Sequence, residues 1–263
     1  MEDNFLVWKF EAFREYLSYE VLRNAAQVLS LYEGEEFSIR NSKVIEMQNL
    51  LSFRTNKNTW MPNRSGEVFI NVNLEGDVYR NKGRLLTSML LIFPKDMSEN
   101  KIRLTNFGNA LAMGHVSRES FYKFIICNYK YPHPAYNEDY AKWVQKDIVL
   151  FPFIIILQVL IGLNEKKQGF ILTTEIAYFI YKVPNHKNIK NYVEQIIESR
   201  EKEEEINVGS SDQVNRKIND ILGFLSLSGY ISLDKRGKYS LNLNMLDEAK
   251  NCIEVVVKKY SLG

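Results

Sequence analysis

The sequence has few residues of the kinds that interrupt regular structure or cross-link a small fold. Of its 263 residues, only 13 are glycine, 6 are proline and 2 are cysteine, which excludes collagenous, disordered and disulfide-rich chains. The two cysteines, Cys127 and Cys252, match no metal-binding spacing and are expected to be reduced thiols in a cytoplasmic protein. The first residues are acidic and lack the cationic segment of a signal peptide. The longest apolar stretch, 148–163, is shorter than a membrane span of about 20 residues, so we expect no membrane partner.

The net charge is also small, because 34 lysines and arginines are balanced by 32 aspartates and glutamates. A formal total of +2 does not by itself indicate a nucleic-acid-binding protein. The sequence is instead rich in aromatic residues, with 15 tyrosines, 15 phenylalanines and 3 tryptophans. Many bulky rings and few helix breakers predict a helix-rich protein with a well-filled core.

Apolar residues recur every three or four positions over much of the chain, which predicts a mainly α fold of the α+β class. Thr105 stands where a helix N-cap is expected, and Pro132 and Pro134 forbid continuation of the helix before them. Residues 207–211 are the best candidate for a linker. The predicted helices are 9–32, 41–53, 79–91, one that begins after Thr105, 117–129, 153–163, 173–181, 188–205, 213–228 and 246–259.

One supersecondary pattern occurs twice along the chain. Helix 79–91 runs into the apolar residues 90–93, a loop and the alternating segment 101–104. Helix 213–228 is followed in the same way by two short strands on either side of the tight turn 234–237. The sequence therefore predicts two winged-helix-like units with short β-wings, joined by a helical linker region. The predicted division is 1–116 for the first unit, 117–206 for the helical connector and 207–263 for the second unit.

Catalytic motifs are missing from the sequence. It has no Gly-x-x-x-x-Gly-Lys loop, no His-Glu-x-x-His zinc site and no Cys-x-x-Cys pair. Glu75 and Asp77 before Lys82 come nearest to a metal-dependent nuclease site, but no strand pattern surrounds them. The acidic run 201–205 is typical of a solvated helix face. We therefore predict neither catalytic residues nor metal ligands in this chain. The histidines, expected at the surface or in turns, are His115, His133 and His186.

The neutral total conceals two charged segments of opposite sign. Residues 40–103 contain eleven basic and six acidic side chains, a net +5, whereas residues 194–205 have a net −4. A local basic surface can bind phosphates even in a neutral chain. On helix 79–91, the side chains at 80, 84, 87 and 88 share one face, with that at 81 beside them. Arginine can pair with guanine, asparagine with adenine, and serine or threonine with phosphate or the thymine methyl group.

This helix is predicted to enter the major groove of DNA, while the second unit places a further helix or wing nearby. The loop before the helix and the strand after it are predicted to contact the DNA backbone or minor groove. An alternative is a regulatory or protein-interaction winged-helix protein whose basic helix is only solvated. Another is a compact nuclease that uses Glu75 or Asp77. The candidate DNA-binding residues are Arg80, Asn81, Lys82, Arg84, Thr87, Ser88, Arg54, Lys57, Asn58, Lys101, Arg103, Asn215, Arg216, Asn219, Lys235, Arg236 and Lys238.

Four blocks of sequence follow one another in an order known from one protein family. The first joins residues 83–92 to residues 102–111, which contain the pattern Leu-Thr-x-x-Gly-x-x-Leu. The second is 121–134, which ends in Tyr-Lys-Tyr-Pro-His-Pro. The third runs from Phe-Pro-Phe at 151 through Leu-Thr-Thr-Glu-Ile-Ala at 172, and the fourth is Phe-Leu-Ser-Leu-Ser-Gly-Tyr at 224–230. Over most of the chain, these blocks resemble the DNA-recognition region of the AlwI-like type IIS restriction and nicking endonucleases.

The resemblance implies sequence-specific recognition of double-stranded DNA in a restriction or related defence system. In that family a metal-dependent nuclease domain follows the recognition region, whereas this chain ends at Gly263 and carries no nuclease motif. Its opening is also acidic and aromatic where the family has an arginine-rich segment. Cutting is therefore expected from a separate or missing nuclease domain or subunit. No cofactor is expected in this chain, and Mg²⁺ is expected only for that nuclease.

Overall fold

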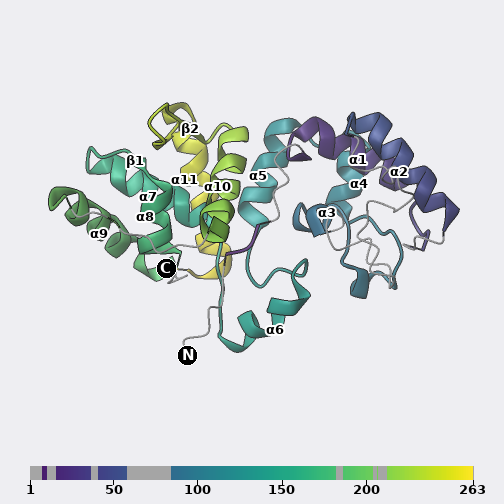
Figure 1. Cartoon of the computed structure of the whole chain (residues 1–263), viewed down its shortest axis with the longest axis horizontal. Helices are drawn as coiled ribbons and strands as arrows, with labels where there is room; N and C mark the ends of the chain where they lie inside the picture. The colour runs from purple at the N-terminus through teal and green to yellow at the C-terminus, as the bar shows by residue number, and fades with distance from the viewer. Residues whose placement is uncertain are drawn as a thin grey trace. The chain divides into compact units, whose positions relative to one another are not determined.

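The computed structural model describes residues 8–10, 16–36, 41–57, 84–181, 186–203, 206 and 212–262 (Figure 1). The fold is mainly α-helical with one small antiparallel sheet, which confirms the predicted fold class. Among the described residues, no helix is both long and apolar enough to span a membrane.

Contacts divide the chain into two compact units. The N-terminal unit lies within residues 15–122 and 134–137, and the C-terminal unit lies within 1–14, 123–133 and 138–263. This grouping differs from the predicted three-part division, because most of the expected connector packs in one unit with the second hairpin. The expected linker, 207–211, lies outside the described residues.

The N-terminal unit is built around helix α1, whose apolar face is buried. Leu22, Ala25 and Leu29 have the spacing of one helix face and are fully buried. Helix α1 begins after Ser18, whose side chain accepts a hydrogen bond from the Val21 N–H at 3.3 Å. The helices of this unit are α1 (Tyr19–Leu31), α2 (Ser42–Thr55), α3 (Arg84–Ser88), the 3₁₀ turn η4 (Lys95–Met97), α4 (Asn106–Ala112) and the start of α5 (Arg118–Asn128).

The predicted start of the first helix at residue 9 is wrong. Residues 8–10 are not helical, because their backbone carbonyls bond to tyrosine hydroxyls of the C-terminal unit. The Tyr181 hydroxyl donates to the carbonyl of Trp8 at 3.1 Å, and the Tyr129 hydroxyl donates to that of Lys9 at 2.6 Å.

The segment 101–104 pairs on both sides within the N-terminal unit. Glu36 pairs with Lys101 and Ile92 with Leu104, both antiparallel, as isolated bridges rather than full strands. Residues 101–104 therefore lie between residues 35–36 and 92–93. The predicted pairing of residues 90–93 with residues 101–104 is present, but as isolated bridges and not as strands.

Helix α4 starts directly on this pairing. Its N-cap Thr105, correctly predicted, accepts the Gly108 N–H at 2.9 Å and donates to the Leu90 carbonyl at 2.5 Å. A Cβ atom on Gly108 would lie 2.1 Å from the carbonyl oxygen of Leu91. In the Leu-Thr-x-x-Gly pattern, the threonine therefore caps α4, and the glycine lets the first turn of the helix pack closely against the backbone of Leu91.

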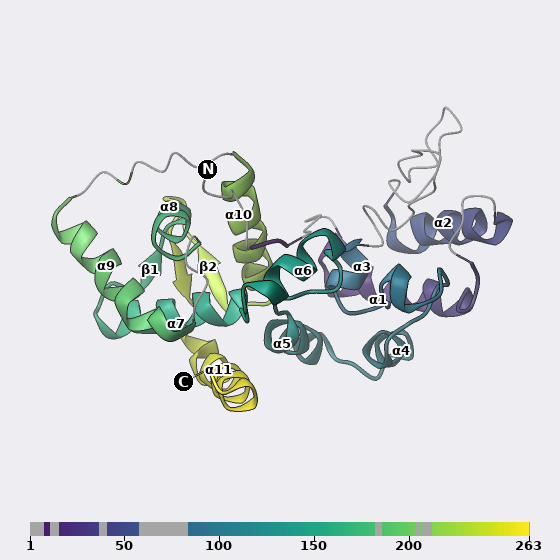
Figure 2. The same cartoon turned by 90° about the horizontal axis from the view of Figure 1, so that it is seen from below.

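The C-terminal unit surrounds helix α7, most of whose side chains are buried. Helix α7 packs against α9 (Ile189–Glu201), α10 (Asp212–Leu227), α11 (Leu246–Tyr260) and the strands β1 (Phe170–Ile171) and β3 (Tyr239–Leu241) (Figure 2). Helix α6 was not predicted, because its short amphipathic pattern follows a proline-rich turn. The helices of this unit are α6 (Asn137–Gln145), α7 (Pro152–Glu165), α8 (Thr173–Glu175) with the π-helical turn η5 (Ile176–Ile180), η6 (His186–Asn188), α9 (Ile189–Glu201), α10 (Asp212–Leu227), η7 (Leu243–Met245) and α11 (Leu246–Tyr260).

The sheet of the C-terminal unit has the strand order β1-β3-β2 and is antiparallel throughout. Its strands are β1 (Phe170–Ile171), β2 (Ile231–Leu233) and β3 (Tyr239–Leu241). The last strand of the hairpin lies in the middle, as residues 101–104 do in the other unit. The two units therefore share one order of pairing, and the predicted helix, strand, turn, strand and helix of residues 212–260 is confirmed.

Candidate nucleic-acid interface

The predicted DNA-contacting residues fall into a described and an undescribed group. Arg80, Asn81, Lys82 and Asn58 lie outside the described residues, as do Glu75 and Asp77. The described candidates come from α2, α3, the segment 101–104, α10 and the turn between β2 and β3.

Two candidates on α3 are not at the surface. Thr87 is 3% exposed and Ser88 is fully buried, and the Ser88 hydroxyl lies 3.4 Å from the Tyr136 hydroxyl, to which it donates. The neighbouring Leu85 and Leu86 are also buried, so this short helix is inserted into the core of its unit. The prediction that Thr87 and Ser88 contact DNA is therefore wrong for this structure.

Arg84, at the start of α3, is half-buried. Its guanidinium carbon lies 5.6 Å from the centre of the Tyr136 ring, a cation–π arrangement. The Tyr136 ring covers part of the Arg84 side chain and holds it at the beginning of the helix. Arg84 is thus a less accessible candidate than its sequence position suggests.

The C-terminal end of α2 carries an exposed basic residue, Arg54, that is positioned by α1. The Asn24 side chain donates to the Arg54 carbonyl at 2.9 Å, and the Arg54 guanidinium donates to the Gln27 side chain at 3.4 Å. Lys57, two residues past the helix, is half-exposed. These polar contacts hold the backbone of Arg54 while its charge faces solvent.

The segment 101–104 presents its two cations on one side. Lys101 and Arg103 are exposed, whereas Ile102 and Leu104 are buried, as the period of two in extended chain requires. The predicted contact of Lys101 and Arg103 with DNA phosphates stays a prediction. Acidic residues lie on the paired segment, where Glu36 is opposite Lys101.

Helix α10 carries three candidates in its first half. Arg216 is exposed, and Asn215 and Asn219 are half-exposed. The Asn219 side-chain carbonyl accepts a hydrogen bond from the Thr173 hydroxyl of α8 at 3.0 Å. This bond orients the carboxamide, so that Asn219 presents its amide nitrogen in a defined direction.

The turn between β2 and β3 is held by Asp234. Its carboxylate accepts the backbone N–H groups of Arg236 at 2.8 Å and Lys238 at 2.9 Å. The same bonds, that from Lys238 first, lower the pKa of Asp234 below its usual value. Gly237 has φ +78°, a left-handed conformation that suits glycine. The turn therefore presents Lys235 and Arg236, both exposed, on a fixed backbone.

Lys238 differs from its two neighbours. Its ammonium nitrogen lies 4.0 Å from the centre of the Phe170 ring, and the Arg200 guanidinium carbon is at the same distance from that ring. Lys238 is half-exposed and its charge is directed to a ring of its own unit. We therefore assign Lys238 first to stabilising the pairing of β3 with β1, and only second to DNA binding.

Sequence reasoning missed the pair that holds this region together. Glu175 is 1% exposed, and Arg200 binds both of its carboxylate oxygens at 2.7 and 2.8 Å. Arg200 also donates to the carbonyl of Phe170 at 2.8 Å, and the Leu172 N–H donates to Glu175 at 2.8 Å. In the sequence, Arg200 is only one charge of an acidic helix. The signal that could have indicated the role of Glu175 is its position three residues after Leu172, at the start of a helix.

A run of acidic residues lies on α9 and directly after it. Glu194, Glu198, Glu201 and Glu203 are all exposed, which agrees with the predicted solvated face. DNA would be repelled by this surface, whereas α10 and the hairpin turn carry exposed cations.

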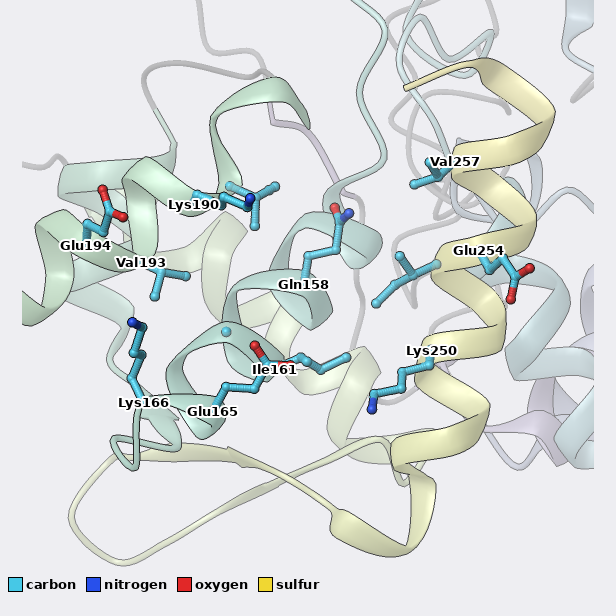
Figure 3. Close-up of a pocket in the computed structure, with 13 residues that line it drawn as sticks. Gln158, Ile161, Glu165, Lys166, Lys190, Val193, Glu194, Lys250, Glu254 and Val257 are labelled. Carbon is cyan, nitrogen blue, oxygen red and sulfur yellow. The ribbon is translucent and has the colours of Figure 1, made fainter. Parts of the chain in front are cut away.

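A pocket of about 610 Å³ lies between α9 and α11 with α7 as its floor (Figure 3). Half-exposed apolar residues such as Ile161, Ile189 and Ile253 line it, and exposed lysines and glutamates such as Lys190 and Glu254 form its rim. Its lining contains no histidine, cysteine, serine or aspartate.

Two histidines are buried, contrary to the surface or turn positions expected for them. His133 is 1% exposed and His186 is 7% exposed, whereas His115 is exposed. Burial lowers the pKa of His133 to about 3 and that of His186 to about 4. His186 accepts the Phe151 N–H through Nε2 at 2.9 Å, which is a structural role.

Comparison with known proteins gives a matching family model and a solved structure with a similar fold. Residues 84–261 match a family model described as restriction endonuclease BpuJI, N terminal. A solved structure of the BpuJ1 endonuclease binding domain, in complex with pyrene- and phenanthrene-modified DNA, has a similar fold with a TM-score of 0.63. The two are 15% identical, and the alignment covers 95% of this chain and 84% of that chain. No curated protein sequence matches.

Proposed function

The chain belongs to the family of the N-terminal part of restriction endonuclease BpuJI, and on this premise we propose that it recognises a specific sequence in double-stranded DNA. The observation that carries the proposal is a set of exposed cations in the first half of α10 and on the β2–β3 turn. Arg216, Lys235 and Arg236 are exposed there on backbone that is held by internal bonds. We call these residues, with Asn215 and Asn219, the α10–hairpin surface.

Helix α10 is suited to the major groove. The exposed Arg216 and the half-exposed Asn215 and Asn219 lie in its N-terminal half, the half that contacts bases in recognition helices, and Asn219 is oriented by Thr173. Arg216 and the two asparagines would contact base edges, where each bidentate contact discriminates by about 1–3 kcal/mol. Lys235 and Arg236 would bind phosphates on the turn, where charge matters more than shape.

The N-terminal unit supplies a second surface in this proposal. Arg54, Lys101 and Arg103 are exposed and would contact the DNA backbone. Arg80, Asn81, Lys82 and Asn58 stay candidates, because the described residues do not include them. Thr87 and Ser88, which are buried, are not part of this surface.

We further infer that cutting is performed by a nuclease domain or subunit outside the described structure. The described residues contain no group of three or more His, Cys, Asp and Glu side chains that could hold a metal ion. Mg²⁺ is expected to act only at the associated nuclease. The type IIS or nicking character and the likeness to the AlwI-like enzymes belong to the same proposal, as does a cytoplasmic location.

Selection from a pool of randomised duplexes at fixed salt tests the proposal. We expect the purified chain to enrich one short, asymmetric motif, and Arg216→Ala to relax the preference at one position of that motif. Lys250→Ala, an exposed lysine on the rim of the α9–α11 pocket, is the matched control and should enrich the same motif. A flat selection would support a winged-helix protein that binds other proteins instead.

A further inference from the structure

The only two cysteines of the sequence meet in the fold. Cys127 lies on α5 and Cys252 on α11, and the two thiols are joined by a hydrogen bond although 125 positions separate them. One helical turn earlier on both helices, the Lys123 ammonium binds the Glu248 carboxylate at 2.7 Å. The two contacts are four residues apart on each helix, so α5 and α11 run side by side and in the same direction here.

The surroundings of the two thiols differ. Cys252 is fully buried, and its sulfur lies 3.4 Å from the Tyr230 hydroxyl. Cys127 is half-exposed. A reagent in solution can therefore reach Cys127, while Cys252 stands behind it and is hydrogen-bonded to its sulfur.

The described residues around the two cysteines do not form a metal site. Within the described part of the chain, no third histidine, cysteine, aspartate or glutamate joins the pair as a metal ligand. Glu248, the nearest carboxylate on α11, is bound to Lys123. Two thiols in contact, one reachable and one buried, are instead the arrangement of a dithiol that closes to a disulfide.

We propose that Cys127 and Cys252 are a covalent modification site, which forms a reversible intramolecular disulfide by exchange with a low-molecular-weight disulfide such as oxidised glutathione. The Cys127 thiolate attacks one glutathione sulfur, the glutathione S–S bond breaks, and the first glutathione leaves as a thiolate that takes up a proton. The Cys252 sulfur then gives up its proton and attacks the Cys127 sulfur. The second glutathione leaves, so two protein thiols are oxidised and one glutathione disulfide is reduced to two thiols.

The electrostatics of the site support thiolate chemistry near neutral pH. The hydrogen bond from the Cys127 thiol lowers the pKa of Cys252 to about 7, against the opposing effect of burial. The same hydrogen bond, together with burial, raises the pKa of the Cys127 thiol, so the negative charge of the ionised pair lies on Cys252. Attack by Cys127 therefore requires its proton to move along the S–H···S bond to Cys252. The hydrogen bond with Tyr230 also lowers the pKa of Cys252, whereas the charges of Glu248 and Lys123, which are bound to each other, act on it in opposite directions.

The test uses the intact, reduced chain treated with oxidised glutathione, quenched with N-ethylmaleimide and measured by intact mass. We expect the wild type to lose two hydrogens, to accept no maleimide and to yield a linked peptide pair containing Cys127 and Cys252. Dithiothreitol should restore two maleimide sites. Cys252→Ser removes the second thiol and should stop at one glutathione on Cys127.

A second measurement does not depend on any variant. The cross-link would join α5 to α11 across a long loop and restrict the unfolded chain, so oxidation should raise the Tm and dithiothreitol should reverse the rise. A wild-type chain that keeps one glutathione on Cys127, or forms only intermolecular dimers, would overturn the proposal. So would two thiols that stay reduced in the folded chain but oxidise together after denaturation.

Discussion

The α-carbon of Gly108 faces the carbonyl oxygen of Leu91 so closely that a Cβ atom would lie 2.1 Å from it. Because the obstacle is backbone, it cannot move aside as a flexible side chain can. This contact places helix α4 on the paired segments of the N-terminal unit, and it explains why the first resemblance block contains glycine at this position.

Gly108→Ala should therefore destabilise the chain. Overpacking of this kind costs about 1–3 kcal/mol, and more where backbone must move. Urea unfolding followed by circular dichroism measures the change. Gly223→Ala is the matched control, because a Cβ on this α10 glycine meets nothing within 4 Å. Its higher helix propensity should stabilise the chain by about 0.5–1 kcal/mol. Equal effects of the two substitutions would contradict the structure.

Arg200→Met should be much more damaging than the loss of an exposed ion pair. It leaves the buried Glu175 carboxylate without its bidentate partner, which typically costs about 3–5 kcal/mol. The control is Lys202→Ala, which removes an exposed contact to Glu198 at 3.9 Å and should change the free energy of unfolding by less than about 0.5 kcal/mol. If both variants unfold at the same urea concentration as the wild type, Arg200 does not hold β1 and α8 as described.

Asp234 can be tested by separating its charge from its hydrogen bonds. Asp234→Asn keeps an acceptor for the Arg236 and Lys238 N–H groups and removes a negative charge, so it should bind DNA at least as tightly as the wild type. Asp234→Ala also removes the acceptor, and should bind about three- to tenfold more weakly than Asp234→Asn. Fluorescence anisotropy with one duplex measures both. Identical affinities would mean that the turn does not position the cations.

The stability of the chain should fall as the pH is lowered from 7 to 4. The pKa of His186 is about 4 in the folded chain and near 6.5 when unfolded, so the unfolded state binds the proton more tightly. The contribution of His186 is present above its unfolded pKa and decreases by about 3 kcal/mol as the pH approaches its folded pKa. The buried His133, whose folded pKa is about 3, adds a decrease of the same sign. His186→Gln lacks this titration and should show a shallower decrease in unfolding free energy over the same range. An unchanged slope would exclude the buried, neutral His186.

Much of this fold can be predicted from local sequence, because caps and apolar periods act over a few residues. Examples are the N-cap Thr105, the turn at residues 234–237 and helix α10, which ends shortly before that turn. The burial of Thr87 and Ser88 could not be predicted, since polar side chains on a basic segment look exposed until Tyr136 is placed beside them. The contact between Cys127 and Cys252 and the pair of Glu175 with Arg200 depend on tertiary packing, which no local pattern contains.

The salt dependence of DNA binding tests the central claim most directly. The quantity to measure is the slope of log Kd against log salt concentration for the wild type, for Arg216→Ala/Lys235→Ala/Arg236→Ala together, and for Lys250→Ala as control. The α10–hairpin surface predicts that the triple variant binds more weakly and that its slope is shallower by about one unit for each phosphate that it no longer binds, whereas the control matches the wild type. A triple variant with wild-type affinity and slope would show that DNA does not bind to this surface.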